Sequence, residues 1–140
     1  MPTLFTRIIE GELPGHFIWR DDRAVAFLTI NPVHRGHALV VPREVVDHWL
    51  DAPAGLLGHL MEVARAVGRA QQAAFPTERT ALVVLGTEVP HLHFHVIPAD
   101  GPEDVAFQRA TAPDQAELAE VAVRLRAELS ALGHGETAVA

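Results

Sequence analysis

Histidine occupies every second position at the start of residues 91–98, which read His-Leu-His-Phe-His-Val-Ile-Pro. Side chains on an extended strand alternate between two faces, so we expect His91, His93 and His95 to share one face. The strand should span residues 89–98, and its other face should pack on a core through Leu92, Phe94 and Val96. Because imidazole titrates near neutral pH, the histidine face concentrates acid, base and nucleophile capacity in one place.

Three interpretations of this face are open. Covalent chemistry at phosphorus suits it, because a neutral imidazole nitrogen is nucleophilic near pH 7 and water displaces its phosphoryl adduct. Neighbouring imidazoles can donate hydrogen bonds to the phosphoryl oxygens as charge develops there. A polar sheet face without chemistry is the second interpretation, and a metal site is the third.

The spacing of the histidines argues against one metal ion bound by all three. On a straight strand His91 and His95 would lie ~13 Å apart, at ~3.3 Å per residue, whereas zinc–nitrogen bonds are about 2.1 Å long. The sequence has no cysteine and no His-Glu-x-x-His segment to supply other ligands. We therefore predict no metal here. Five histidines elsewhere are expected to be ordinary solvated residues: His16, His34, His48, His59 and His134.

The composition indicates one acidic domain with a sizeable core. The chain has 140 residues, of which 49% are hydrophobic, and 11 Lys and Arg against 18 Asp and Glu give a net charge of −7. An acidic chain without a basic run is a poor candidate for binding a nucleic-acid backbone. Neither a membrane-spanning apolar run nor a signal-like start is evident, so we expect a soluble, cytoplasmic protein with no membrane partner.

Hydrophobic periodicity predicts short strands alternating with helices. The expected helices cover residues 5–10, a long segment capped by Asp51 and ending near residue 74, and residues 114–132. The expected strands cover residues 17–19, 24–28, 36–42, 81–85 and 89–98. This order favours an α+β fold with a mainly antiparallel sheet. We assign residues 1–132 to a single domain and residues 133–140 to a flexible C-terminal tail.

The histidine segment resembles the signature of the histidine triad (HIT) superfamily of nucleotide hydrolases and transferases, in which histidine alternates with hydrophobic residues. Three more blocks are similar to motifs of that family and follow in its order: residues 5–14, 26–32 and 36–43. The four blocks together cover roughly residues 4–98. The long helix after them resembles a bacterial HIT-like branch that is related to nucleoside phosphoramidases and dinucleoside polyphosphate hydrolases. The resemblance implies about five antiparallel strands with one long helix and a C-terminal helix, and a homodimer.

The resemblance also implies roles for four histidines. His93 matches the nucleophile that attacks the α-phosphorus and carries a nucleotidyl intermediate. His95 matches the position that contacts the phosphate and the leaving-group oxygen, and His91 and His37 match two supporting histidines. A nucleophilic imidazole also needs an acceptor for its other ring nitrogen, so that the correct tautomer faces the substrate.

The nucleotide-binding positions are likewise carried over from the family. Five residues match its apolar base pocket, although core packing would explain them too: Leu4, Phe5, Ile8, Phe27 and Ile30. Thr29 stands where many members have an Asp for the ribose hydroxyls, and the hydroxyl offers a single bond without charge assistance. Glu88 stands in a shortened loop, residues 85–90, where a phosphate-contacting Ser or Thr is common. Backbone amides near Val89 are additional phosphate donors.

The function expected from this resemblance is a nucleotidyl hydrolase or transferase. It would cleave at the α-phosphate of a nucleoside phosphoramidate or a dinucleoside polyphosphate, through a covalent nucleotidyl–histidine intermediate. No cofactor is expected, and the partner would be a small-molecule nucleotide rather than a nucleic acid. The alternatives are a nucleotide-binding protein with weak or lost catalysis, and a metal-dependent hydrolase. At the ordinary histidine pKa, activity would fall on acidification through about pH 6.5.

Overall fold

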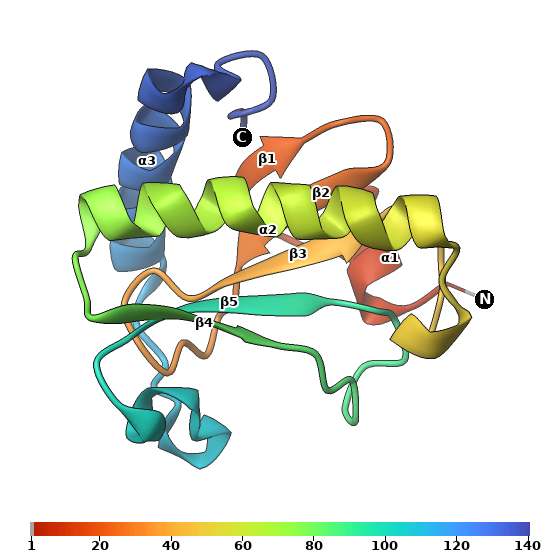
Figure 1. The fold of residues 1–140 in the computed structure, drawn as a ribbon, viewed down its shortest axis with the longest axis horizontal. Coiled ribbons are helices and arrows are strands. Elements are labelled where there is room, and N and C mark those ends of the chain that lie inside the picture. Colours follow the sequence, from red (N-terminus) through yellow and green to blue (C-terminus); the bar gives the residue numbers. More distant parts are fainter. Residues whose placement is uncertain (1) are drawn as a thin grey trace.

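The computed structural model describes residues 2–140 and consists of one antiparallel sheet with helices on both faces (Figure 1). The five strands lie in the order β1-β2-β3-β5-β4. Their bounds are β1 Phe17–Arg20, β2 Ala24–Leu28, β3 Ala38–Pro42, β4 Arg79–Val83 and β5 Phe94–Ala99. The helices are α1 Leu4–Ile9, α2 Ala54–Ala74 and α3 Gln115–Leu129. The predicted α+β fold, with five antiparallel strands, a long helix and a C-terminal helix, is confirmed.

Four short helical turns complete the chain. They cover Trp49–Asp51, Pro102–Val105, Phe107–Arg109 and Ser130–His134. In Figure 1 the long α2 lies across the sheet, and the turns that follow β5 lie below β4, at the lower left of the view. Among the described residues, no helix is long and apolar enough to cross a membrane.

The sheet separates two apolar clusters, because side chains alternate along its buried strands. On β2, Leu28 belongs to the larger cluster, which α2 and α3 cover, and Phe27 belongs to the smaller one, which α1 covers. The central β3 is buried along its whole length, as its continuous apolar run predicts. The strip opposite the histidines is confirmed as a core anchor in the larger cluster: Leu92, Phe94 and Val96.

The predicted histidine strand is shorter than the sequence suggests. β5 begins at Phe94 instead of residue 89, and the last ladder pair toward this end joins Val40 to Phe94. The segment before β5 leaves the ladder, and the Leu92 N–H donates instead to the Val46 carbonyl in a loop (2.7 Å). Side chains still alternate along this segment, because Leu92 packs in the larger cluster while His91 and His93 both contact Phe5. The histidines therefore share one face as predicted, although the predicted strand was too long.

The long helix begins later than predicted. Asp51 lies in the preceding turn, and Pro53 is the residue that caps α2, with its carbonyl accepting from Leu56 and Leu57. The cause is local, since the His48 side chain accepts from the Leu50 N–H and starts a separate turn there. Prediction of Asp51 as the cap was therefore wrong.

The last helix begins as predicted, with Asp114 accepting from the Glu117 N–H at 2.8 Å. Its buried stripe comprises Leu118, Val121, Leu125 and Leu129, whereas the predicted continuation at Leu132 is 46% exposed. The stripe ends because the helix changes its winding after Leu129, and Gly133 adopts a φ of +100°.

Residues 133–140, expected to be a flexible tail, lie against the domain in the structure. The Arg20 N–H of β1 donates to the Thr137 carbonyl at 2.9 Å, and Ala138 is buried in the larger cluster. His134 packs against Trp19, with ring centroids 5.2 Å apart. These contacts place the end of the chain beside β1.

Candidate active site

A tight turn delivers His37 to the start of β3. The His37 N–H donates to the His34 carbonyl at 3.1 Å, and Gly36 adopts a φ of +93°, which glycine tolerates without strain. A Cβ at Gly36 would lie 2.9 Å from the Phe75 ring. Because Leu39 is paired with His95 across the ladder, His37 lies on the same face of the sheet as His95.

His37 and His95 form a hydrogen-bonded pair with a defined direction. The Val33 N–H, which can only donate, lies 3.2 Å from Nδ1 of His37, so this nitrogen is the acceptor. A neutral His37 then carries its proton on Nε2, which lies 3.0 Å from Nδ1 of His95. Nδ1 of His95 must accept that proton's hydrogen bond, and the proton of neutral His95 lies on Nε2. His95 therefore offers Nε2–H as a donor.

His93 has the opposite arrangement. Its Nδ1 lies 2.7 Å from the carbonyl oxygen of His91, which can only accept, so Nδ1 carries the proton. Nε2 of neutral His93 is then unprotonated and keeps its lone pair. The rings of His93 and His95 lie with centroids 4.9 Å apart. A nucleophilic nitrogen and a hydrogen-bond donor thus lie side by side.

His91 is held on both nitrogens. Nε2 donates to the Pro42 carbonyl at 2.7 Å, and Nδ1 accepts from the Thr3 hydroxyl at 2.6 Å. Thr3 is also the N-cap of α1, where its side chain accepts from the Thr6 N–H. His91 is fully buried, and its two hydrogen bonds connect the start of α1 to the end of β3.

All four histidines are shifted toward the neutral form. Burial, with smaller contributions from the charges on His95 and His93, lowers the pKa of His37 to about 3. Burial and His93 lower the pKa of His95 to about 4. The pKa of His93 is also lowered by burial, against the raising effects of its bond to the His91 carbonyl and of the Glu88 charge. Burial likewise lowers the pKa of His91. Neutral imidazoles are the state that the hydrogen bonds above require.

The residues matched to the base pocket fall into two groups. Phe5 and Phe27 are buried and meet edge to face, with centroids 5.6 Å apart. Phe5 also contacts the His93 ring edge to face at 4.8 Å, so it forms a wall beside that histidine. Ile8 is partly buried against the same cluster, whereas Leu4 and Ile30 are 47% and 60% exposed. The structure therefore gathers three of the five and leaves two facing outward.

The polar positions matched to the nucleotide lie at the edges of the site. The Thr29 hydroxyl accepts from the Asn31 N–H at 3.2 Å, which leaves its own proton available to a ligand. Glu88 is exposed, and its charge is close enough to raise the pKa of His93. Val89 packs partly buried against the smaller cluster, and its carbonyl accepts from the His91 N–H at 2.8 Å.

Phe107 is a site residue that sequence reasoning missed. It lies in the irregular segment after β5, yet its ring centroid is 4.7 Å from that of His95 and 6.1 Å from that of His37. The segment is fastened to the loop before β3 by the Thr111 N–H, which donates to the Pro32 carbonyl at 2.9 Å. No periodicity marks Phe107; the signal that the sequence offers is one aromatic residue in the connection between β5 and α3.

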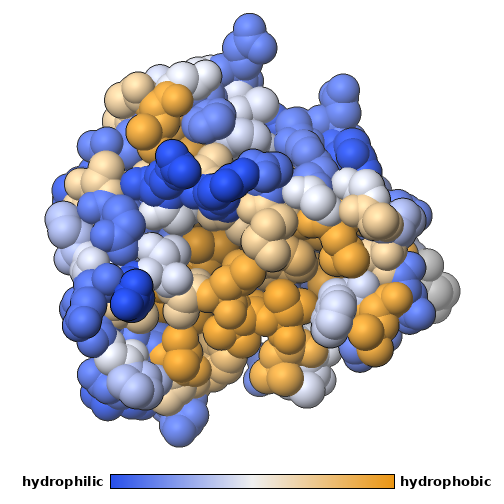
Figure 2. Space-filling model, viewed as in Figure 1, coloured by the Kyte–Doolittle hydropathy of each residue, from blue (hydrophilic) through white to orange (hydrophobic). Residues whose placement is uncertain are grey.

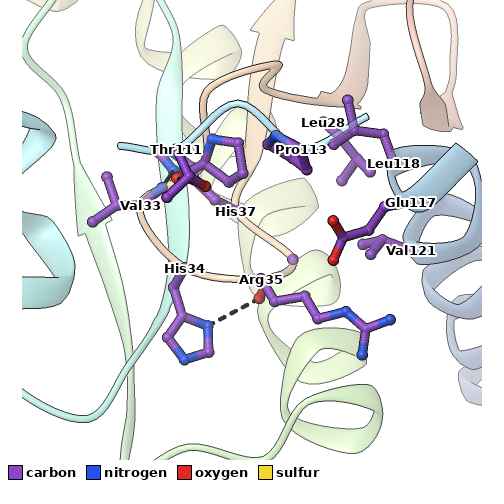
Figure 3. Close-up of a pocket in the computed structure, with 12 residues that line it drawn as sticks. Leu28, Val33, His34, Arg35, His37, Thr111, Pro113, Glu117, Leu118 and Val121 are labelled. Carbon is purple, nitrogen blue, oxygen red and sulfur yellow. Dashed lines mark hydrogen bonds between the residues drawn. The ribbon is translucent and has the colours of Figure 1, made fainter. Parts of the chain in front are cut away.

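Two hollows adjoin the histidines. A cavity of about 110 Å³ lies behind His37, between the loop before β3 and α3, and Figure 3 shows Glu117 and Arg35 at its wall. Ligand sites usually measure ~300–1,000 Å³, so this cavity is too small for a nucleotide. A hollow of about 30 Å³ borders His93, between the Trp49 turn and the loop at Gly86. His93 is 6% exposed.

Comparison with known proteins gives one consistent family. The HIT domain model matches residues 10–101. A HIT-like protein of Methanocaldococcus jannaschii, itself described as uncharacterised, is 34% identical over 99 residues, which are 68% of this chain and 77% of that protein.

Solved structures of similar proteins share the fold over nearly the whole chain. A hypothetical histidine triad nucleotide-binding protein from Sulfolobus tokodaii superposes with a TM-score of 0.82 at 26% identity, covering 91% of this chain and 92% of that one. A zinc-bound histidine triad family protein from Mycobacterium smegmatis superposes with a TM-score of 0.81 at 25% identity, covering 94% and 96%.

Proposed function

Because this chain belongs to the HIT domain family, we propose that it is a nucleotidyl hydrolase or transferase acting at the α-phosphate of a small nucleotide. The observation that carries this proposal is the pairing of opposite tautomers in His93 and His95. Their hydrogen bonds leave a bare Nε2 on the first and an Nε2–H on the second. An attacking lone pair and a donor for the phosphoryl oxygens are the two groups that displacement at phosphorus needs.

The reaction proceeds in two displacements. In the first, the lone pair on Nε2 of His93 forms a bond to the α-phosphorus, and the bond from phosphorus to the leaving atom breaks with its electrons going to that atom. In the second, water attacks phosphorus and the nitrogen–phosphorus pair returns to His93. An amine leaving group takes up one proton through solvent, and the attacking water releases one. Nε2–H of His95 stabilises the developing charge by hydrogen bonding.

The base and ribose lie on the α1 side of the site in this proposal. Leu4 and Ile30 offer exposed apolar surface, and Ile8 is partly buried next to Phe5, which reaches His93. The Thr29 hydroxyl at the end of β2 donates to a ribose oxygen. Apolar surface with one placed hydroxyl is typical of a nucleoside site.

Charge near His93 favours a phosphoramidate over a dinucleoside polyphosphate. The Glu88 carboxylate influences the pKa of His93, so it also repels further negative charge there. The whole chain carries a net charge of −7. A phosphoramidate brings one charged phosphate group and an uncharged or cationic leaving amine, whereas a polyphosphate chain brings several negative charges.

Product release from matched substrates tests this proposal directly. Adenosine phosphoramidate and diadenosine tetraphosphate are incubated with the protein, and release of the nucleoside monophosphate is followed by chromatography. We expect turnover of the phosphoramidate, its loss in His93→Ala, and a mass increase of one nucleotidyl group on a peptide containing His93 after acid-free quenching. Full turnover by His93→Ala would remove His93 as the nucleophile.

A nucleotide-binding role with little catalysis is the second candidate. The observation in its favour is that His93 is only 6% exposed, which limits the approach of a substrate phosphorus, whereas Leu4 and Ile30 offer open apolar surface to a base. Calorimetric titration with AMP and GMP separates the two candidates. Tight binding without turnover of any substrate supports this role, and turnover excludes it.

Metal-dependent hydrolysis fits the triad poorly, although one structural neighbour is zinc-bound. Both nitrogens of His91 and both of His37 already have partners, as does Nδ1 of His93. Only Nε2 of His93 and Nε2 of His95 remain, which is too few for a zinc site of the usual three or four protein ligands. A separate group of residues that could bind a metal ion contains no member of the triad. It consists of His34, Asp100 and Asp104, whose ligand atoms lie within 4.8 Å of one another.

We propose a homodimer on the basis of the exposed edge of the sheet. β4 pairs only with β5 and forms the end of the strand order, so its outer edge is unpaired. Figure 2 shows apolar side chains below α2, in the region of β4. Exposed apolar residues of these elements are Met61 on α2 and Leu82 on β4, and Leu85 follows β4. Sedimentation equilibrium checks this: a dimer is expected, and Leu82→Lys should shift it toward the monomer.

A further inference from the structure

Gln71 of α2 is a fully buried polar residue to which the proposed reaction assigns no role. Its exposure is 0%, and its side-chain nitrogen donates to two carbonyls, that of Gly36 at 2.8 Å and that of Val96 at 2.9 Å. Two accepting carbonyls fix the orientation of the amide, because only the NH₂ end can donate twice. The amide therefore joins α2 to two separate segments of the sheet.

The two segments are those that carry the paired histidines. Gly36 directly precedes His37, and Val96 directly follows His95. The ladder between β3 and β5 ends at the pair Ala38 and Val96, so Gly36 lies beyond its last cross-strand contact. Beyond that pair, the Gln71 amide links the Gly36 backbone to the Val96 backbone in place of a ladder pair.

The oxygen of the same amide is left without a partner. Oε1 of Gln71 is buried and has no hydrogen bond among the described residues. A buried acceptor without a partner lowers stability, so an apolar residue would be preferred here if packing were the only requirement. No aliphatic residue could donate to both carbonyls, and the two hydrogen bonds are what the amide adds.

We propose that Gln71 is a positioning residue that holds the His37 and His95 backbones at the separation their hydrogen bond requires. This inference rests on the proposed function, in which Gln71 keeps Nε2–H of His95 directed at the substrate. Loss of the bridge lets the loop before β3 move away from β5, which lengthens the 3.0 Å bond between the rings. His95 then no longer has a fixed tautomer, and the donor beside His93 is present for only part of the time.

Gln71→Met tests this inference, since it keeps the length and approximate volume of the side chain and removes both donors. Gln72→Met is the matched control, because Gln72 is the next residue of the same helix and bonds Thr77 and Thr80 instead. Val67→Ala, one turn earlier and fully buried, controls for a loss of stability alone. The readouts are side-chain ¹⁵N NMR of the histidines, which reports the tautomer, and kcat and KM with the phosphoramidate.

We expect Gln71→Met to mix the tautomers of His95 and to lower kcat about 10-fold with KM nearly unchanged, because misplacement of a catalytic group acts on the reaction step. Both controls should keep the wild-type tautomer and a kcat within twofold. A Gln71→Met protein with the wild-type tautomer and kcat overturns the inference. The NMR readout needs no turnover, so it tests Gln71 even if the proposed reaction is wrong.

A measurement on the unaltered protein covers the case in which Gln71→Met does not fold. The side-chain NH₂ protons of Gln71 should exchange with solvent far more slowly than those of Gln72, which bonds the hydroxyls of partly buried Thr77 and exposed Thr80. Equal, fast exchange of the two amides would show that the bridge does not persist in solution and would overturn the inference.

Discussion

Nε2 of His37 lies 3.0 Å from Nδ1 of His95, and the backbone N–H of Val33 on the far side of His37 sets the direction of that hydrogen bond. A backbone amide has no alternative protonation state, so it determines which nitrogen of each imidazole carries a proton. Val33 therefore specifies, through His37, that the proton of His95 lies on Nε2, the donor that the proposed reaction uses.

Removal of His37 should reduce the rate without preventing binding. We expect His37→Ala to lower kcat by about 10²-fold, the order of magnitude for one lost donor or misplaced acid–base group, because His95 loses the partner that fixes its tautomer. His16→Ala, in which a partly buried histidine bonded to Gln115 is removed, is the control. Steady-state kinetics with the phosphoramidate measures both, and an unchanged kcat in His37→Ala would contradict the pairing.

The acid limit of activity should lie below the ordinary histidine pKa. The nucleophile must be neutral, and burial lowers the pKa of His93, so the reactive form persists to lower pH than about 6.5. The midpoint on the acid side of a kcat/KM profile is thus expected below 6.5. Glu88→Gln removes a charge that raises the pKa of His93, so its midpoint should move lower still. A midpoint at or above 6.5 in the parent protein contradicts this assignment.

Stability should decrease on acidification before the histidines of the folded protein titrate. The pKa of His37 is about 3 in the folded chain and about 6.5 when unfolded. Between these values the unfolded state binds the proton and the folded state does not, so unfolding becomes easier as pH falls from 6.5 toward 3. The loss from His37 is on the order of a few kcal/mol.

Denaturant unfolding at several pH values measures this effect. His37→Gln removes one titrating group, so its free energy of unfolding should depend less steeply on pH than that of the parent between pH 6.5 and 4. Parallel curves for the two proteins would show that His37 does not titrate abnormally.

Thr3 should stabilise α1 and the triad together. Thr3→Val keeps the shape of the side chain but removes the α1 cap and the bond to His91 at 2.6 Å. A loss of about 1–2 kcal/mol in the free energy of unfolding is expected. Thr3→Ser keeps the hydroxyl and should remain within a few tenths of a kcal/mol of the parent. Equal stability of the Val and Ser variants would contradict the role given to the hydroxyl.

Chelation should leave turnover unchanged. The partners of His91, His37 and Nδ1 of His93 leave the triad too few free nitrogens for a catalytic zinc ion. Activity is measured before and after exhaustive dialysis against EDTA, with metal content determined on the same samples. A loss that added zinc restores would reopen the metal-dependent alternative, and Asp104→Asn would then test the separate group at His34.

The sequence by itself determined the frame of the site. Alternation of the histidine segment placed its imidazoles on one face and Leu92 in the core, and the continuous apolar run of residues 38–42 placed β3 centrally. Both are local properties, because the period of an extended chain decides which side each residue faces. The motif resemblance then indicated the family, which the HIT domain match confirms.

Only the tertiary structure decided the protonation pattern and the supporting contacts. The partners that fix the tautomers of His37 and His91 are Val33, Thr3 and the Pro42 carbonyl. Phe107 packs on His95, and Gln71 bonds the backbone next to His37 and His95. They come from separate loops and helices and have no common spacing in the chain. Hydrogen bonding acts between atoms about 3 Å apart, so these roles exist only once folding brings distant segments together.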